Sequence, residues 1–325
     1  MRVRGLLLVG VLLVSGCRSA GRFARPGQPL DRLGDEIVVC GQMFHTGAPV
    51  VLWMDPGGYD AYRAQCKFDP SRELPSNPVS DSVVRYGTFR RHLPDDVRAQ
   101  VEDSGWSVPL LREVVDQFVL HYDVCGSSRR CFRVLHDIRG LSVHFMLDLD
   151  GTIYQTLDVK ERAWHAGVAN DRSIGIEIAN IGAYPDREVL EQWYGPDDRG
   201  RVRVTLPPSM GDGGVRTPGF VAYPSRPEPI RGVVHGQALV QYDLTDAQYD
   251  SLIRLTATLC RVLPKIRPDG PRDANGAIRW DVLDEQELAG FRGLLGHYHV
   301  SESKVDPGPA FDWERVIAGV RAYQE

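Results

Sequence analysis

Near its C-terminus the chain contains the stretch Gly296-His297-Tyr298-His299-Val300-Ser301-Glu302-Ser303-Lys304-Val305-Asp306-Pro307-Gly308. This stretch holds imidazole, ammonium and carboxylate groups in one short segment. The apolar run 291–295 before it predicts a strand that ends at His297, and residues 309–322 after it predict a closing helix. A histidine at a strand end and an aspartate on the next turn can meet at one point, as metal ligands do when a further imidazole arrives from elsewhere. Taken alone, the pattern is also typical of a surface loop, so the case for a metal site depends on the residues that the rest of the chain supplies.

Length and composition set the broad class. The chain has 325 residues, of which 42% are hydrophobic and 25% charged, so it can form one large globular domain with an appendage. The net charge is −5 and there is no long basic run, which argues against nucleic acid as a partner.

The first 16 residues have the pattern of an export signal. Residues 1–4 include two arginines, and the apolar run 6–14 that follows is too short to cross a bilayer. The small residues 14–16 directly before Cys17 resemble the lipobox of bacterial lipoproteins. This resemblance implies a mature chain that starts at a lipidated Cys17, with residues 17–34 as a flexible tether to a membrane. A plain secretory signal that contains a cysteine is the alternative.

Export also determines the compartment and its redox state. The resemblance implies a periplasm-facing protein of the bacterial envelope, and Arg18, where inner-membrane lipoproteins often have aspartate, favours the outer membrane. Disulfides persist in such a compartment. Cys125 and Cys131 bracket a polar loop and are the best disulfide candidates, whereas a pairing of Cys40 with Cys66 stays open.

The chain divides into a small N-terminal part and a large C-terminal part. Residues 35–94 predict a β appendage, with strands at 37–39 and 50–53, followed by a connector rich in proline and serine. The main domain is expected at 95–325. An irregular insertion at about 185–230 contains eight of the chain's 22 prolines, and its length indicates a cleft wall or disorder.

Strands of the main domain are expected at 114–122, 142–147, 152–157 and 173–180, and a helix at 245–263 begins with a capping box. His121 is the next-to-last residue of the first of these strands, and this position is compatible with either a buried core residue or a residue of a functional site. In the strand 173–180, alternate residues are isoleucine, and Glu177 lies on the other face between Gly175 and Ala179. Small neighbours leave room for a group to approach Glu177, although a glutamate on a solvated sheet face has the same pattern.

Several motifs, taken in order, resemble type 2 N-acetylmuramoyl-L-alanine amidases, which are zinc enzymes of the peptidoglycan-recognition-protein superfamily. The matching pieces are His121 at its strand end and the segments 142–155, 163–167, 173–180, 244–252 and 296–313. The resemblance covers about residues 110–324 and is interrupted by the insertion. It implies an α/β fold with a central mixed β-sheet flanked by helices, beside the small N-terminal β appendage.

The resemblance also implies the residues of the site. One Zn²⁺ per chain would be held by two imidazoles and one carboxylate, with the fourth position open for water. A glutamate would act as general base and then acid, and a lysine would stabilise the oxyanion. The residues carried over are His121, His297 and Asp306 as metal ligands, Glu177 and Lys304 as catalytic residues, and Trp164 and His165 beside the cleft, touching substrate or supporting the metal.

One departure from the family leaves a ligand ambiguous. The family often has Arg and Asp after the second ligand histidine, where this chain has Tyr298 and His299. In an extended segment, alternation would put His299 on the same face as His297. We expect His297 to be the ligand, because it occupies the Gly-His position of the motif.

The implied activity is zinc-dependent hydrolysis of the amide bond between N-acetylmuramic acid and L-alanine, in cell-wall turnover or recycling. The expected partners are peptidoglycan or muropeptide and, through the lipid, a membrane; the protein is expected to be a monomer. Two alternatives stay open: a module that binds muropeptide without cutting it, and an amidase whose substrate is soluble anhydro-muropeptide and not intact wall.

Overall fold

The computed structural model describes residues 26–74 and 90–324. The signal peptide at 1–16 and the lipidation candidate Cys17 lie outside the described residues, as do parts of the tether and of the connector. The chain divides into two compact units, Met1–Arg32 and Leu33–Glu325. All helices and strands described below belong to the second unit. Among the described residues, no helix combines the length and the apolar composition needed to cross a bilayer.

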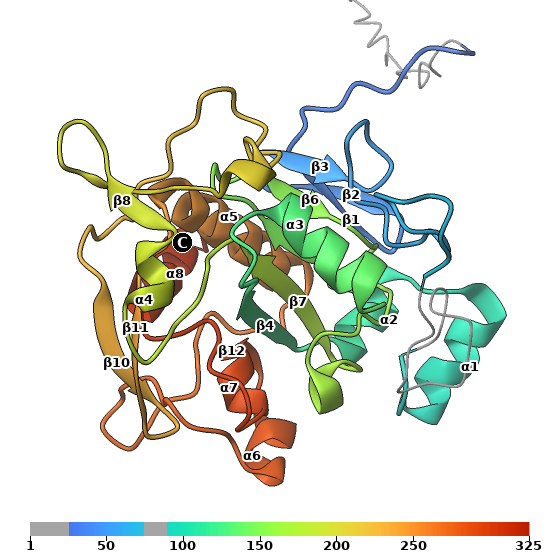
Figure 1. Cartoon of the computed structure of the whole chain (residues 1–325). Helices are drawn as coiled ribbons and strands as arrows, with labels where there is room; N and C mark the ends of the chain where they lie inside the picture. Colours follow the sequence, from blue (N-terminus) through green and yellow to red (C-terminus); the bar gives the residue numbers. More distant parts are fainter. Residues whose placement is uncertain (1–25, 75–89, 325) are drawn as a thin grey trace, which may run out of the picture. The chain divides into compact units, whose positions relative to one another are not determined.

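A six-stranded mixed sheet forms the centre of the second unit (Figure 1). Its strands, in spatial order, are β12 (Gly293–Gly296), β4 (Gln117–Tyr122), β7 (Ser173–Ile178), β5 (Phe145–Leu147), β6 (Ile153–Gln155) and β3 (Val50–Leu52). Neighbouring strands are parallel except for the antiparallel β5–β6 pair. The α/β fold with a central mixed sheet flanked by helices is thus confirmed.

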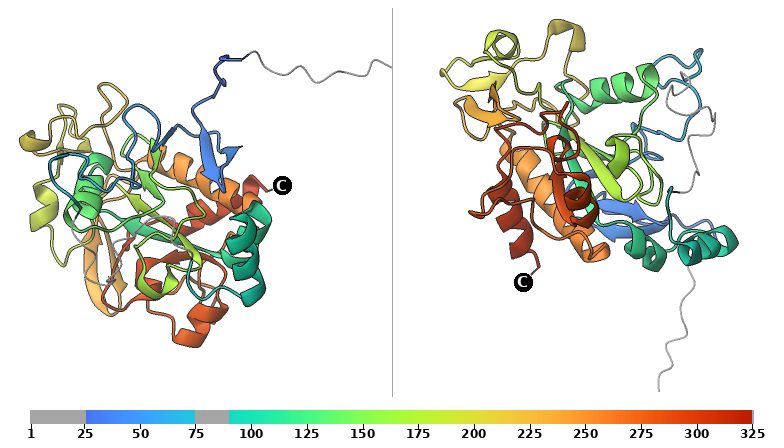
Figure 2. Two further views of the ribbon diagram at one scale, coloured as in Figure 1. Left: turned by 90° about the vertical axis from the view of Figure 1, so that its right-hand side faces the viewer. Right: turned by 90° about the horizontal axis from the view of Figure 1, so that it is seen from below.

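Helices cover both faces of this sheet (Figures 1 and 2). On one face lie α5 (Asp246–Val262) and α8 (Trp313–Ala322), which pack on each other. On the other face lie α3 (Ser128–Phe132) and the π-helical turn η1 (Arg133–Ile138) that continues it. The remaining helices are α1 (Asp95–Ser104), α2 (Val108–Val114), α4 (Glu188–Glu191), α6 (Glu285–Gly290), α7 (His297–Val300) and the 3₁₀ turns η2 (Gly167–Ala169) and η3 (Pro208–Met210).

The alternation along β7 determines which face carries chemistry. Ile174, Ile176 and Ile178 are completely buried in the core that includes α5. Burial of each isoleucine side chain contributes about 2 kcal/mol, so a one-residue slip of the strand, which would expose all three, is strongly disfavoured. Glu177 therefore lies on the opposite face, towards α3. At the start of α5, the Thr245–Gln248 capping box expected from the sequence is present.

The N-terminal strands are attached to the main sheet. β1 (Glu36–Val39) and β2 (Gln42–His45) form a separate two-stranded hairpin, which is the small β element expected there. The amide of Gln155 in β6 accepts from the Val38 N–H and donates to the Val38 carbonyl, both at 2.7 Å. The other expected strand, β3, pairs with β6 and forms the edge of the central sheet. The hairpin is therefore fixed to the main domain by buried hydrogen bonds.

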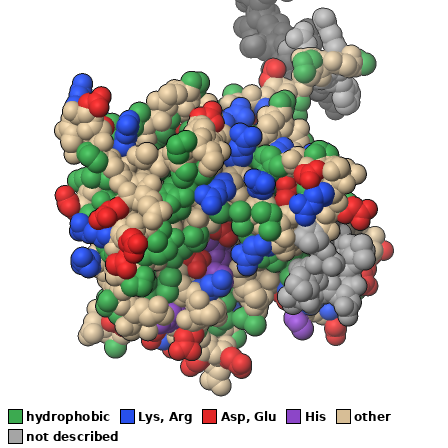
Figure 3. Space-filling view, viewed as in Figure 1, with side chains coloured by type: hydrophobic (Ala, Val, Ile, Leu, Met, Phe, Trp, Pro, Cys, Tyr) green, Lys and Arg blue, Asp and Glu red, His purple; other side chains and the backbone are tan. Residues whose placement is uncertain are grey.

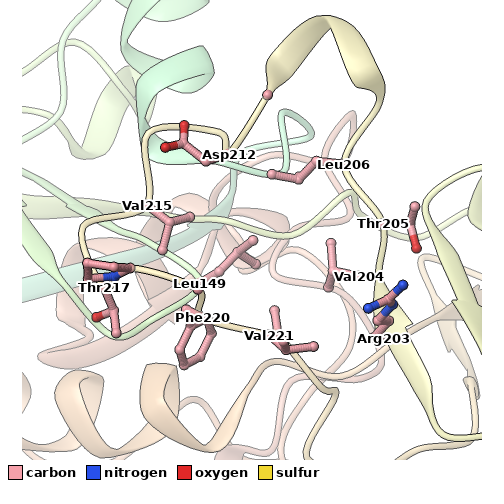
Figure 4. A pocket seen from close by; sticks show the side chains of 14 residues that line it. Leu149, Arg203, Val204, Thr205, Leu206, Asp212, Val215, Thr217, Phe220 and Val221 are labelled. Carbon is pink, nitrogen blue, oxygen red and sulfur yellow. The ribbon is translucent and has the colours of Figure 1, made fainter. Parts of the chain in front are cut away.

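The Pro-rich insertion has structure of its own. It contains α4 and the hairpin of β8 (Tyr194–Pro196) and β9 (Val202–Val204), and the β10 (Ile230–Val234) and β11 (Gln237–Gln241) hairpin follows it. Its apolar side chains pack around Leu149 of the β5–β6 turn, with Val204, Leu206, Val215 and Phe220 nearby (Figure 4). This satellite core orders the insertion as a wall against the main domain.

Candidate functional site

The register of three parallel strands assembles the site. β12 pairs with β4 so that Gly296 is opposite Leu120, and β4 pairs with β7 so that His121 is opposite Glu177. His297 directly follows Gly296 and therefore lies beside His121, although the two are 176 positions apart in the chain. Three residues from distant parts of the sequence thus meet at the carboxyl ends of neighbouring strands.

Two imidazoles and one carboxylate converge on one point. The Nδ1 atoms of His121 and His297 are 3.0 Å apart, and Oδ2 of Asp306 lies 2.8 Å from the first and 3.0 Å from the second. All three residues are mostly buried. Zinc bonds of about 2.0–2.1 Å would place tetrahedral ligands about 3.3 Å apart. We call these three atoms (His121 Nδ1, His297 Nδ1 and Asp306 Oδ2) the donor triangle. The donor triangle has the chemistry, and nearly the dimensions, of a metal site with two histidines and one carboxylate.

The charge states of these groups also suit a metal. Burial, and then the charge of His297, lower the pKa of His121 to about 4, so its ring is neutral at pH 7. Burial alone would raise the pKa of Asp306, but His297 and the hydrogen bond with His121 bring it below its usual value. A neutral imidazole and an ionised carboxylate are the forms that bind metal.

His165 supports His121 from the side away from the donor triangle. Its Nδ1 lies 3.1 Å from His121 Nε2, and its own Nε2 lies 3.3 Å from Ser173 Oγ. Such a contact orients a ligand imidazole and leaves Nδ1 for the metal. The ring of His165 occupies the space above Gly175, where an added Cβ would lie only 2.5 Å from His165 Nδ1. Of the two roles that the resemblance left for His165, the geometry favours support of the metal ligand.

Glu177 and Lys304 line the same pocket, which has a volume of about 150 Å³ and contains the donor triangle. Burial, followed by the charges of Asp306 and Asp123, raises the pKa of Glu177 well above its usual range. Lys304 forms no ion pair with a carboxylate in the ranges 26–74 and 90–324 that the structure describes. The pocket therefore holds a carboxyl group that can exchange protons and a cation that is free to meet a developing negative charge.

His299 is turned away from the donor triangle. Residues His297–Val300 form the one-turn helix α7, not the extended segment expected from the sequence. Residues two apart on a helix differ in direction by about 200°. His299 is fully buried, its Nδ1 accepts from the Gly296 N–H at 2.9 Å, and its Nε2 lies 2.9 Å from the Arg279 carbonyl oxygen. Both ring nitrogens are used by the backbone, so His299 does not compete with His297.

Trp164 lies at the rim of the pocket between two cations. The guanidinium of Arg162 lies 4.3 Å from the centre of its ring and that of Arg91 lies 5.4 Å away. These contacts fix the ring and reduce its availability for stacking on a sugar. Its Nε1–H is buried and has no hydrogen-bond partner in the described part of the chain.

The remaining pocket wall contains the cysteine pair and an aspartate. Cys125 and Cys131 are adjacent free thiols, and the disulfide expected from the sequence is not formed in the structure. A hydrogen bond between the thiols lowers the pKa of Cys125 and raises that of Cys131. Asp123 was missed from the sequence; it lines the pocket, its Oδ2 has no partner among the described residues, and burial raises its pKa. Its position two residues after His121, at the end of the same strand, was the available signal.

Comparison with known proteins identifies the family. The family model for N-acetylmuramoyl-L-alanine amidase (Amidase_2) matches residues 111–309, which is more than half of the chain. The curated relatives include the 1,6-anhydro-N-acetylmuramyl-L-alanine amidase AmpD of Haemophilus influenzae, 24% identical over 199 residues, covering 58% of this chain and 64% of the relative. AmpD of Enterobacter cloacae is 24% identical over 187 residues, covering 55% of this chain and 56% of the relative. The chain thus spans less than two thirds of the length of these relatives.

Similar solved structures include a selenomethionine derivative of AmpD, 22% identical, covering 64% of this chain and 86% of that chain with a TM-score of 0.32. Another is the N-acetylmuramyl-L-alanine amidase AmiD from E. coli in complex with anhydro-N-acetylmuramic acid-L-Ala-D-gamma-Glu-L-Lys, 18% identical, covering 63% of this chain and 57% of that chain with a TM-score of 0.35. On the extent of the family match, this chain belongs to the type 2 N-acetylmuramoyl-L-alanine amidase family.

Proposed function

We propose that this protein is a zinc-dependent amidase that cleaves the bond between the lactyl group of N-acetylmuramic acid and the L-alanine of the stem peptide. The observation that carries the proposal is the convergence of His121, His297 and Asp306 in one pocket with Glu177 and Lys304. Membership of the amidase family supports the same activity.

The donor triangle would hold the metal through two imidazole nitrogens and one carboxylate oxygen. When bound, zinc would bring the pKa of a water molecule to about 7 and polarise the scissile carbonyl. His165 keeps the His121 ring oriented through the 3.1 Å contact to its Nε2. Loss of such outer contacts typically weakens metal binding 10–100-fold.

Glu177 is the proton carrier in this proposal. Its carboxylate takes a proton from the attacking water and delivers it to the nitrogen of the leaving L-alanine. A raised pKa suits this double role, because the group must both accept and release a proton near neutral pH. Lys304 donates to the oxygen of the scissile carbonyl as negative charge develops on it.

Muropeptides are the proposed substrate class. The AmpD relatives are named for 1,6-anhydro-N-acetylmuramyl-L-alanine, which supports soluble fragments of the wall as substrates. The lipobox-like residues before Cys17 support a lipid anchor in a membrane, and Arg18 favours the outer membrane, with the enzyme facing the periplasm close to intact wall as well as to fragments. A Cys17→Ser variant should then move from the membrane fraction to the soluble fraction.

Release of free stem peptide from muropeptide by the purified protein tests the activity. Wild-type protein should release it, a chelator should stop the reaction, and added zinc should restore it. A Glu177→Gln variant should bind one zinc per chain and release at least a thousandfold less peptide. Binding of muropeptide without chelator-sensitive release would instead support the non-catalytic recognition module.

A further inference from the structure

Arg90 is a completely buried cation. Figure 3 shows Lys and Arg side chains on the surface, gathered around a depression in which histidine and acidic side chains are visible. Unlike those surface cations, Arg90 is 0% exposed. It belongs to the connector before the main domain and lies outside residues 111–309 that the family model matches. A buried charge is costly unless its hydrogen bonds are satisfied, so the partners of Arg90 indicate what it does.

The Arg90 guanidinium joins the two ends of one loop. This loop, residues 159–173, carries Trp164 and His165 and ends at the first residue of β7. Nε and Nη2 donate to carbonyl oxygens where the loop begins, and Nη1 donates to carbonyl oxygens where it ends. The acceptors are Val159 (2.8 Å), Lys160 (3.3 Å) and Glu161 (2.8 Å) at the beginning and Asn170 (3.2 Å), Asp171 (3.2 Å) and Ser173 (3.1 Å) at the end. The planar fork of arginine suits this arrangement, because it donates in two directions at once.

Asn170 connects the guanidinium to His165. The Asn170 carbonyl accepts from Arg90, and its side-chain Oδ1 accepts from the His165 N–H at 3.1 Å and from the Ala166 N–H at 2.7 Å. Ser173, another carbonyl partner of Arg90, has its Oγ 3.3 Å from His165 Nε2. The backbone and the ring of His165 are thus both held by residues that Arg90 fixes.

His144 joins the loop to the strand beneath the same ring. Its Nδ1 accepts from the Gly175 N–H at 3.1 Å, so its Nε2 carries the proton and donates to the Glu161 carbonyl oxygen at 2.9 Å. The Glu161 carbonyl is also a partner of Arg90, and Gly175 is the residue above which the His165 ring lies. The loop and β7 are therefore connected through one buried cluster of hydrogen bonds.

A second closure of the loop is independent of Arg90. Arg162 Nε lies 2.5 Å from Asp171 Oδ1, and the same oxygen accepts from the Arg91 N–H at 2.8 Å. Since this ion pair links the loop without the Arg90 side chain, substitution of Arg90 should loosen the loop and leave the domain folded.

We propose that Arg90 is a positioning residue of the metal site, which acts through the loop and His165 on the ligand His121. This inference rests on the proposed function, in which the donor triangle binds zinc. His165 Nδ1 lies 3.1 Å from His121 Nε2, and outer contacts of this kind orient a ligand imidazole. Without the guanidinium, the two ends of the loop are no longer held together, and His165 loses its fixed position against His121.

Zinc competition against a chromogenic chelator tests the proposal on folded variants. Arg90→Lys keeps the charge but concentrates its donors at one nitrogen, which cannot serve both ends of the loop. Arg90→Ala removes the side chain and leaves a space of its shape. Both variants should bind zinc about tenfold more weakly than the wild type, or weaker still. Millimolar guanidinium should restore the affinity of Arg90→Ala, whereas methylammonium should not; if Arg90→Ala does not fold, Arg90→Lys carries the test.

A double-variant cycle separates positioning from general stability. In a His165→Ala background, Arg90→Lys should cause no further loss of zinc affinity, because its route to His121 is already removed. Leu259→Ala is the control for stability. Leu259 is completely buried in α5, on the other face of the sheet, so its truncation should lower the free energy of unfolding and leave zinc affinity unchanged.

Wild-type zinc affinity in Arg90→Lys and Arg90→Ala would overturn the proposal. Additive losses in the cycle, or an equal loss of affinity in Leu259→Ala, would also overturn it and would reduce Arg90 to a stabilising residue. A wild-type protein that binds no zinc would instead refute the metal site of the proposed function.

Discussion

A single methyl group at Gly175 should disturb the metal site without touching a ligand. Gly175 faces the ring of His165, and an added Cβ would lie 2.5 Å from Nδ1, 2.6 Å from Cε1 and 2.7 Å from Cγ of that ring. His165 in turn holds His121 Nε2 at 3.1 Å. The substitution Gly175→Ala therefore pushes on the group that orients a metal ligand.

The size of the effect follows from these distances. Ordinary contact begins at about 3.4 Å, so the ring of His165 must move by about 0.9 Å (3.4 − 2.5). A shift of that size breaks the contact with His121. Loss of such outer support weakens zinc binding 10–100-fold, which corresponds to about 1.4–2.8 kcal/mol. The cost in folding should be of the order of 1–3 kcal/mol, as for other overpacked interiors.

Zinc competition against a chromogenic chelator measures the affinity of each variant. Gly195→Ala is the control, since Gly195 is also a strand residue and the nearest atom to its added Cβ is 3.8 Å away. In a His165→Ala background the clash is absent, so the double variant with Gly175→Ala should bind zinc as the His165→Ala single variant does. Additive losses in the double variant, or unchanged affinity in Gly175→Ala alone, would refute the reasoning.

Two further predictions concern stability. Burial, and then the charge of Arg90, lower the pKa of His144 to about 3, so the ring stays neutral in the folded state while the unfolded state takes up a proton below pH 6.5. The resulting contribution to the free energy of unfolding is complete above pH 6.5 and decreases as the pH falls towards 3, and at pH 5 it has dropped by about 2 kcal/mol. Denaturant titrations of metal-free protein at several pH values measure this dependence, and His144→Gln should remove its part of the slope of unfolding free energy against pH. An unchanged slope would mean that His144 titrates normally in the fold. Under mild oxidation, Cys125 and Cys131 should form a disulfide, so that two titratable thiols are lost and the free energy of unfolding rises by about 2 kcal/mol. A Cys125→Ser/Cys131→Ser variant should show no such rise. Retention of both thiols in the oxidised wild type would contradict this prediction.

Much of the sheet could be predicted from local patterns. The isoleucines of β7 alternate with Gly175 and Glu177, and this alternation correctly separated the core face from the face of the site. The Thr245–Gln248 pair marked the start of α5. These signals are visible in sequence because they depend on residues one to three positions apart.

The spatial arrangement of the site depends on contacts that local patterns do not contain. His299 was ambiguous because the sequence after Gly296 did not show that the chain turns at once into α7. The support of His121 by His165 depends on the space above Gly175, which can be recognised only when the register between β4 and β7 is known.

Elemental analysis of the soluble form, purified without residues 1–17, measures the metal site most directly. We expect one zinc per chain in the wild type and in a His299→Ala variant that remains folded, and a large loss of zinc in His297→Ala. Zinc that persists in His297→Ala and disappears in His299→Ala, or a wild-type protein that binds no zinc, would contradict the assignment of His121, His297 and Asp306 as the metal ligands.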